Sequence, residues 1–178
     1  MTSSIQMLVL SAILAIVSLT IPTYGTNLLW VADPGYSFLL QVALPRIGIA
    51  ISSIIGGYAG VKLFQISRDD DLKNLAIPLA MVAIALLIGG LFIEVTIYVY
   101  MYTLICPTLI GLGIAKLSND DWIRKPGIIL GFIAGLFIAG IILVAVGITS
   151  RDWIMVIDLG TGMRVLSASM IGALLKIR

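Results

Sequence analysis

Histidine is absent from the 178 residues of this sequence, and cysteine occurs once, as Cys106. Haem, zinc, copper and iron–sulfur sites rely on histidine or on several cysteines, so this chain alone cannot supply their usual ligands. A serine or cysteine nucleophile would also lack its customary histidine base. We therefore expect no cofactor or metal held by this chain, and we expect catalysis to be a less favoured class of function than structure or transport.

Charge is also scarce, because charged residues make up 11% of the chain and the formal net charge is +2. The sequence has no basic cluster that would neutralise a row of phosphates, which argues against nucleic acid as a partner. Hydrophobic residues make up 60% of the chain, whereas soluble domains average about 45–50% apolar residues. A soluble fold of this size cannot bury so much apolar surface. The composition predicts one integral membrane domain over residues 1–178, with the lipid bilayer as its surroundings.

The apolar residues fall into long blocks. A bilayer core of about 30 Å needs about 20 apolar residues per helix. Five blocks meet this requirement, namely residues 5–23, 38–62, 75–116, 127–148 and 153–175. The third block would extend about 63 Å as one helix, so it must reverse. Aromatic side chains favour the membrane interface, and we place this reversal at Tyr98 to Tyr102. The expected fold is an all-α polytopic bundle of six transmembrane helices.

The distribution of lysine and arginine predicts the orientation of this bundle. With six helices, eight basic residues fall on the same side of the membrane: Lys62, Arg68, Lys73, Lys116, Arg124, Lys125, Lys176 and Arg178. Basic residues accumulate on the cytoplasmic side of membrane proteins. We therefore expect both termini in the cytoplasm and a multi-pass protein of the cell membrane.

Four ionisable residues are expected inside the bilayer: Arg46, Glu94, Asp158 and Arg164. Each costs at least about 2.5–3.5 kcal/mol to insert, so such residues normally face other helices. Counting residues from the predicted outer ends places both arginines about 15 Å deep. One interpretation is that the four residues form buried pairs, within the chain or with another subunit. The alternative is that they line a path for an ion or solute, with the arginines binding negative charge.

Small residues recur every four positions in the predicted fifth helix, at Gly127, Gly131, Gly135 and Ala139. Such a stripe lets a second helix approach closely, and the second helix can belong to this chain or to another. Other glycines also mark sites of close contact, namely Gly56, Gly57, Gly60, Gly111 and Gly113.

The stretch from Arg46 through Gly60-Val61-Lys62-Leu63-Phe64 resembles the first helix of the DoxX/DoxD group of small membrane proteins. The resemblance covers about a tenth of the chain, with the Gly-to-Lys spacing differing by one residue and an additional helix preceding it. Some members of that group are associated with quinone-linked respiratory enzymes, so the resemblance implies a respiratory or quinone-linked setting.

Three functions fit these observations. The first is a non-catalytic accessory subunit of a larger membrane complex, with other membrane subunits as partners. A respiratory complex is one such setting. The second is a small oligomeric transporter or channel subunit whose path runs past the intramembrane charges. The third is an intramembrane enzyme acting on lipid or quinone. The absence of cofactor ligands favours the first.

Overall fold

The computed structural model describes residues 2–28, 44–67, 70–89, 96–119 and 153–177, together with residues 133, 135, 136, 138–140 and 142. Within the five long ranges, side chains are described for residues 3–20, 44–67, 70–87, 103–119 and 161–177. These residues form α1 (Thr2–Leu28), α3 (Leu44–Ile66), α4 (Asp70–Gly89), α5 (Thr96–Asn119) and α7 (Trp153–Ile177). The residues described between 133 and 142 are helical as well, and no strand occurs in any part that the structure describes. The predicted all-α class is confirmed for these residues.

The long apolar block divides into two helices, as predicted, but at a different place. Helix α4 ends at Gly89 and α5 begins at Thr96, so Tyr98 to Tyr102 belong to the first turns of α5. The prediction of a reversal at the tyrosines is therefore wrong. Glycine commonly ends helices because it adopts the conformations that close the last turn, and Gly89 and Gly90 provide this signal. Aromatic rings can lie near an interface without leaving the helix.

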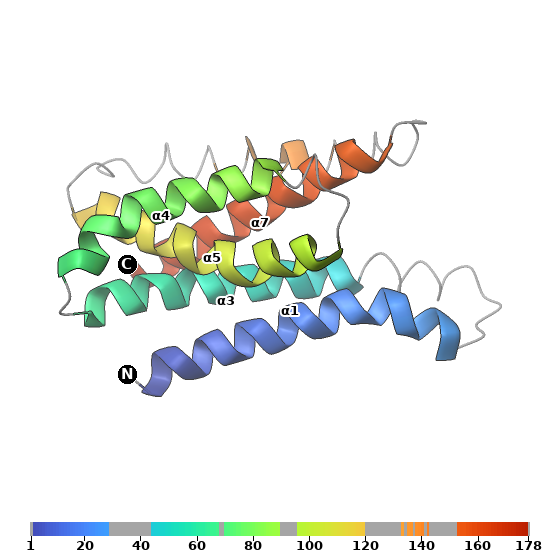
Figure 1. The fold of residues 1–178 in the computed structure, drawn as a ribbon, viewed down its shortest axis with the longest axis horizontal. Coiled ribbons are helices and arrows are strands. Elements are labelled where there is room, and N and C mark those ends of the chain that lie inside the picture. The colour runs from blue at the N-terminus through green and yellow to red at the C-terminus, as the bar shows by residue number, and fades with distance from the viewer. Residues whose placement is uncertain are drawn as a thin grey trace.

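Helix α3 lies at the centre of the bundle and packs against α1, α5 and α7. Helices α3, α5 and α7 run in one direction, whereas α1 and α4 run in the other (Figure 1). Helix α4 packs mainly on α5. The bundle therefore has two outer helices, α1 and α4, that are antiparallel to the inner helices on which they pack.

Glycine allows the inner helices to touch through their backbones. A Cβ atom on Gly57 of α3 would overlap the backbone carbonyl of Ser169 in α7. A Cβ atom on Gly172 of α7 would likewise overlap the carbonyl of Ile54 in α3. The same holds between α3 and α5, where a Cβ atom on Gly111 would overlap the carbonyl of Gly57. Small residues at helix contacts permit such close approach.

Buried hydroxyl groups join α1 to α3. Ser11 Oγ donates a hydrogen bond to the Ser52 carbonyl oxygen over 2.9 Å, and Ser52 Oγ donates to the Ser11 carbonyl oxygen over 2.7 Å. One turn nearer the start of α3, Gly48 lies against the side chain of Ser18. Each polar group of this reciprocal pair therefore has a partner within the chain.

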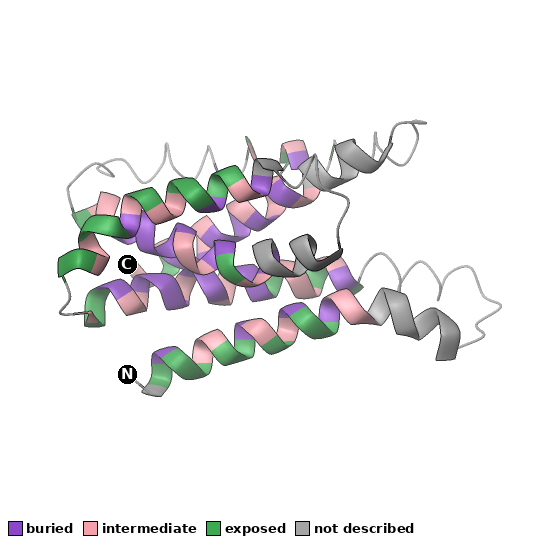
Figure 2. Ribbon diagram, viewed as in Figure 1, coloured by how far each residue is buried: buried purple, intermediate pink, exposed green. Residues whose placement is uncertain are grey.

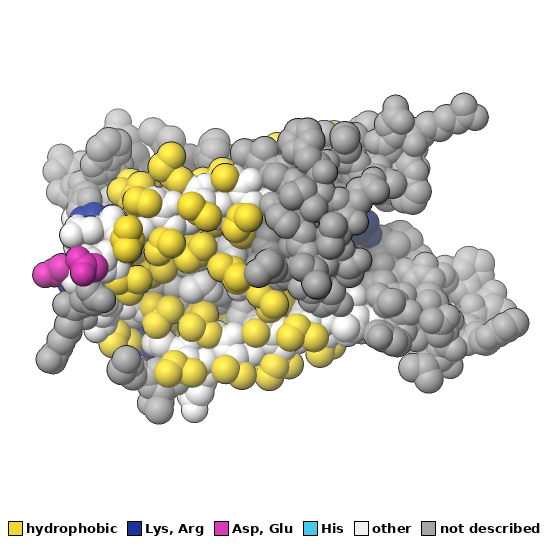
Figure 3. Space-filling model, in the orientation of Figure 1, with side chains coloured by type: hydrophobic (Ala, Val, Ile, Leu, Met, Phe, Trp, Pro, Cys, Tyr) yellow, Lys and Arg dark blue, Asp and Glu magenta, His cyan; other side chains and the backbone are white. Residues whose placement is uncertain are grey.

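Large apolar side chains lie on the outside of the bundle, among other places over α1, α3 and α4 (Figures 2 and 3). Those on α1 are Ile5, Val9, Leu10, Ile13, Ile16 and Val17. Many fully buried positions are instead occupied by small or hydroxyl-bearing residues, including Ser52, Ser53, Ala59, Ser167 and Ser169, beside larger ones such as Val61 and Val165. By length and composition, two of the described helical segments are apolar enough to cross a membrane, Ser3–Thr20 and Leu44–Ile66.

Described lysines gather at the end of the bundle that holds both chain termini (Figures 1 and 3). Lys62, near the end of α3, donates a hydrogen bond to Ser3 Oγ near the start of α1. The Nζ atom of Lys176 lies 5.8 Å from the centre of the Tyr58 ring. At the start of α4, Lys73 lies 3.6 Å from the exposed Asp70 carboxylate. This end is thus the polar end, and α3 begins at the opposite one.

Candidate functional site

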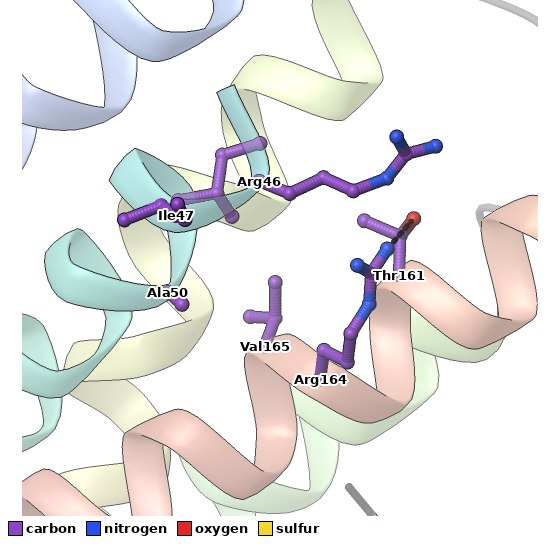
Figure 4. A pocket seen from close by; sticks show the side chains of 7 residues that line it. Arg46, Ile47, Ala50, Thr161, Arg164 and Val165 are labelled. Atoms are coloured by element: carbon purple, nitrogen blue, oxygen red, sulfur yellow. Dashed lines mark hydrogen bonds between the residues drawn. The ribbon is translucent and has the colours of Figure 1, made fainter. Parts of the chain in front are cut away.

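A pocket of about 210 Å³ lies between α3 and α7, and both candidate arginines line it (Figure 4). Helix α3 contributes Arg46, Ile47, Ile49 and Ala50, and α7 contributes Thr161, Arg164 and Val165. The volume is well above the roughly 10–15 Å³ that a single water molecule requires. The pocket is therefore large enough for a small polar group together with solvent.

The packing of α3 against α7 explains where the pocket forms. The backbones touch where Gly57 meets Ser169 and where Gly172 meets Ile54. Nearer the beginning of both helices, Ile47, Ala50 and Val165 are among the side chains that line the pocket. Because α3 and α7 run in the same direction, their earlier residues face one another across the pocket (Figures 1 and 4).

Arg46 lies in the first turn of α3, directly after the buried Pro45. Proline is tolerated in the first turn of a helix because its missing N–H would have no partner there. It also fixes the backbone dihedral just before the arginine. The half-buried Arg46 side chain extends from α3 toward Thr161 (Figure 4).

Arg164 lies near the middle of α7, and its own helix orients its side chain. Its Nη2 atom donates a hydrogen bond of 3.1 Å to Thr161 Oγ1, one turn earlier. Residues three apart lie on the same face of a helix, which is why Thr161 can hold this guanidinium. The guanidinium is thereby directed to the side of the pocket that Arg46 also approaches (Figure 4).

Two cations lie among the described residues that line the pocket. A guanidinium stays charged at physiological pH and carries several N–H donors but no acceptor. The remaining lining is mainly aliphatic, from Ile47, Ile49, Ala50 and Val165. A planar guanidinium binds carboxylate or phosphate oxygens in a bidentate way. The arrangement is therefore suited to an anionic group, supplied by a ligand or by an acidic residue.

The outcome differs among the four ionisable residues predicted to lie within the bilayer. Arg46 and Arg164 are brought together in one pocket. Glu94 lies outside the described residues, and the side chain of Asp158 does too, although its backbone belongs to α7. The depth of these residues in a bilayer stays a prediction. Arg46 occupies the first turn of the described helix, and residues 38–43 of the predicted apolar block lie outside the described residues.

The predicted small-residue stripe is described in part. Gly127 and Gly131 lie outside the described residues, whereas Gly135 is exposed and Ala139 is half-buried. A Cβ atom on Gly135 would meet nothing within 4 Å. Close helix contacts occur at the five other glycines for which they were predicted, and also at Gly172. The five are Gly56, Gly57, Gly60, Gly111 and Gly113. The role of the stripe in helix association stays a prediction.

Sequence reasoning missed Thr161 and the buried serines of α1. Ser4, Ser11 and Ser18 are spaced seven residues apart and are all buried. A seven-residue spacing places side chains on one face of a helix, as in coiled coils. This spacing was a visible signal for the contact with α3. Thr161 had a weaker signal, its position three residues before Arg164.

Within the described part of the chain, no three histidine, cysteine or acidic residues come together in a way that would hold a metal ion. Cys106 is fully buried, and its Sγ atom donates to the Ala83 carbonyl oxygen over 3.5 Å. This places the thiol in the contact between α5 and α4.

In comparisons with protein-family models, curated proteins and solved structures, the chain matches none of them.

Proposed function

We propose that this chain is a multi-pass integral membrane protein that binds an anionic solute between α3 and α7, as a small transporter or channel subunit. The observation that carries the proposal is that Arg46 and Arg164, on two helices far apart in sequence, line one pocket. Two guanidinium groups that line one cavity from two helices can engage the oxygens of one anionic group together.

The distribution of side chains supports the membrane part of the proposal. Large aliphatic residues cover the outside of the bundle, while serine, glycine and alanine fill much of its interior. Water would penalise such a surface, whereas lipid chains solvate it. Helices in lipid associate through small residues and interhelical hydrogen bonds, which are the contacts between α3 and its neighbours.

The proposed topology has six spans with both termini in the cytoplasm. It is supported by five helices of 20 to 27 residues, by the helical residues between 133 and 142, and by the lysines at one end. Cysteine labelling tests it in a Cys106→Ser background. Gln65→Cys and Asn74→Cys, both at exposed positions, should react with an impermeant reagent from the cytoplasmic side. Labelling of the two from opposite sides would contradict the topology.

The anion site is tested on the purified full chain in nanodiscs of phosphatidylcholine. We expect inorganic phosphate to bind, and the Arg46→Ala and Arg164→Ala double variant to lose at least about tenfold in affinity, the equivalent of roughly 1.4 kcal/mol. Lys73→Ala, at the opposite end of the bundle, is the matched control and should leave the affinity unchanged. In liposomes, anion flux should also fall in the double variant. Flux that survives the loss of both arginines would contradict the transport function.

The alternative source of negative charge is the chain itself. If Glu94 or Asp158 neutralises the arginines, Glu94→Gln or Asp158→Asn should destabilise the protein, because it would leave a cation uncompensated. The ligand-binding proposal makes a different prediction for these two variants. Either carboxylate variant should retain or strengthen phosphate binding, because removing a negative charge reduces competition for the guanidinium groups.

An accessory subunit of a larger membrane complex is the second candidate function. The observation that favours it is the open face at Gly135, which is flanked by the exposed side chains of Ile138 and Ile142. Mass spectrometry of the proteins that copurify in mild detergent tests it. A partner lost in Gly135→Leu but retained in Met81→Leu, an exposed position on α4, would support a subunit interface on this face. A chain that purifies as a stable homo-oligomer alone would contradict it.

A further inference from the structure

The arginine pocket lies beside the apolar outer surface of α3. Ile47 lines the pocket and is also 56% exposed. Leu44 and Ile51 are exposed as well. Residues at positions i, i+3 and i+7 follow one face of a helix, so Leu44, Ile47 and Ile51 form a continuous apolar stripe. The pocket is therefore next to a surface that lipid chains would cover.

We infer that the pocket takes the phosphate head of an amphiphile whose acyl chains lie along this stripe. The inference rests on the proposed anion site and specifies its ligand. It assigns the two arginines to the phosphate and the Ile47 stripe to the hydrocarbon. The ligand then enters from the lipid, beside Ile47.

The chemistry of the lining fits this class of ligand. Guanidinium groups bind phosphate oxygens in a bidentate way, and two of them can engage one phosphate from two helices. Ile49, Ala50 and Val165 provide aliphatic contacts but no further charge. A strongly hydrated free anion gains no binding free energy from such apolar walls. The carbon atoms next to a lipid phosphate do gain it, because their apolar surface is buried against the walls.

The size of the pocket limits it to the head of the ligand. Its volume is about 210 Å³, below the roughly 300–1,000 Å³ of pockets that enclose drug-sized molecules. A lipid would consequently keep its chains outside, against α3. The exposed stripe supplies the surface that such a binding mode requires.

The test compares three probes on the full chain in detergent: a short-chain phosphatidic acid, a phosphatidylcholine of the same chain length, and inorganic phosphate. We expect the phosphatidic acid to bind at least about tenfold more tightly than either of the others, which corresponds to roughly 1.4 kcal/mol. Arg46→Gln and Arg164→Gln should each weaken phosphatidic acid binding by a similar factor. Arg46→Lys and Arg164→Lys, which keep the charge, should bind with intermediate affinity and show that loss of binding does not reflect loss of folding.

The apolar part of the site has its own variant. Ile51→Asn, on the same stripe but not among the residues that line the pocket, should weaken phosphatidic acid binding at least about threefold, since it removes part of the acyl contact, and should leave inorganic phosphate binding unchanged. The matched control is Ile13→Asn, on the exposed face of α1, which should change neither affinity.

Each remaining outcome overturns the inference in a distinguishable way. Equal affinity for inorganic phosphate and phosphatidic acid, with no effect of Ile51→Asn, would show a site for a free anion and leave the proposed function intact. Phosphatidic acid binding that persists without either arginine would show annular lipid and overturn the inference. A folded protein that binds none of the three probes would overturn both the inference and the proposed anion site.

Discussion

Helix α3 forms two interfaces that differ in what they leave between the helices. Against the antiparallel α1, it is joined by the reciprocal hydrogen bonds of Ser11 and Ser52. Against the parallel α7, it touches by backbone at Gly57 and then leaves a pocket beside Arg46 and Arg164. One helix thus carries a self-satisfied polar contact on one side and a cavity with two cations on the other.

The difference separates polar groups that hold a structure from polar groups that can act on a ligand. A pair of serines offers both donors and acceptors, so two facing serines satisfy one another. Guanidinium groups offer several donors and no acceptor, so two arginines beside one pocket cannot satisfy one another and are suited to the acceptor oxygens of an anionic group. We therefore expect changes between α1 and α3 to affect stability alone, and changes between α3 and α7 to affect both stability and binding.

The largest expected effect breaks the backbone contact between α3 and α7. Gly57→Ala places a Cβ atom on the Ser169 carbonyl, and we expect a loss of unfolding free energy at or above the usual 1–3 kcal/mol of an overpacked site. Titration of the detergent-solubilised chain with a denaturing detergent, followed by circular dichroism, measures it. Gly135→Ala is the matched control, because its Cβ meets nothing within 4 Å. Similar losses in both variants would contradict the described packing.

A smaller effect is expected between α1 and α3, at Gly48. A Cβ atom on Gly48 would overlap the Ser18 side chain, whose Oγ atom donates to the Leu14 carbonyl oxygen over 2.6 Å. Since a side chain can shift more easily than a backbone, we expect Gly48→Ala to cost about 1 kcal/mol, the lower end for overpacking. Adding Ser18→Gly should recover most of the loss that is due to the overlap, once the cost of Ser18→Gly alone is subtracted. An additive double variant would show that the two residues do not touch.

The smallest effect tests the serine pair. Ser11→Ala and Ser52→Ala each remove one interhelical donor, and such bonds contribute about 0.6 kcal/mol in membrane proteins. Ser53→Ala removes a hydroxyl that bonds within its own helix, to the Ile49 carbonyl oxygen. It should cost less than either of the other two. Neither Ser11→Ala nor Ser52→Ala should alter phosphate binding. A change in phosphate affinity would contradict the expectation that the interface between α1 and α3 affects stability alone.

Much of the helical framework was predictable because apolar block length sets helix number and span. The exact position of the reversal between α4 and α5 was not predictable, because two signals indicate different positions. One is the preference of aromatic residues for the interface, and the other is glycine at a helix end. Arg46 and Arg164 stood out because charge is conspicuous in an apolar block. Their meeting in one pocket was not predictable, because the rotation and crossing of α3 and α7 depend on which glycines touch, and a sequence with many glycines permits several choices.

The central claim is that Arg46 and Arg164 act on the same anionic group. A double-mutant cycle on phosphatidic acid affinity tests it most directly, using Arg46→Gln, Arg164→Gln and the combined variant, each checked for folding by circular dichroism. If both arginines bind one phosphate, the combined loss will differ from the sum of the single losses by at least about 0.5 kcal/mol, as coupled residues do. Strictly additive losses, or no loss in either single variant, would contradict the account.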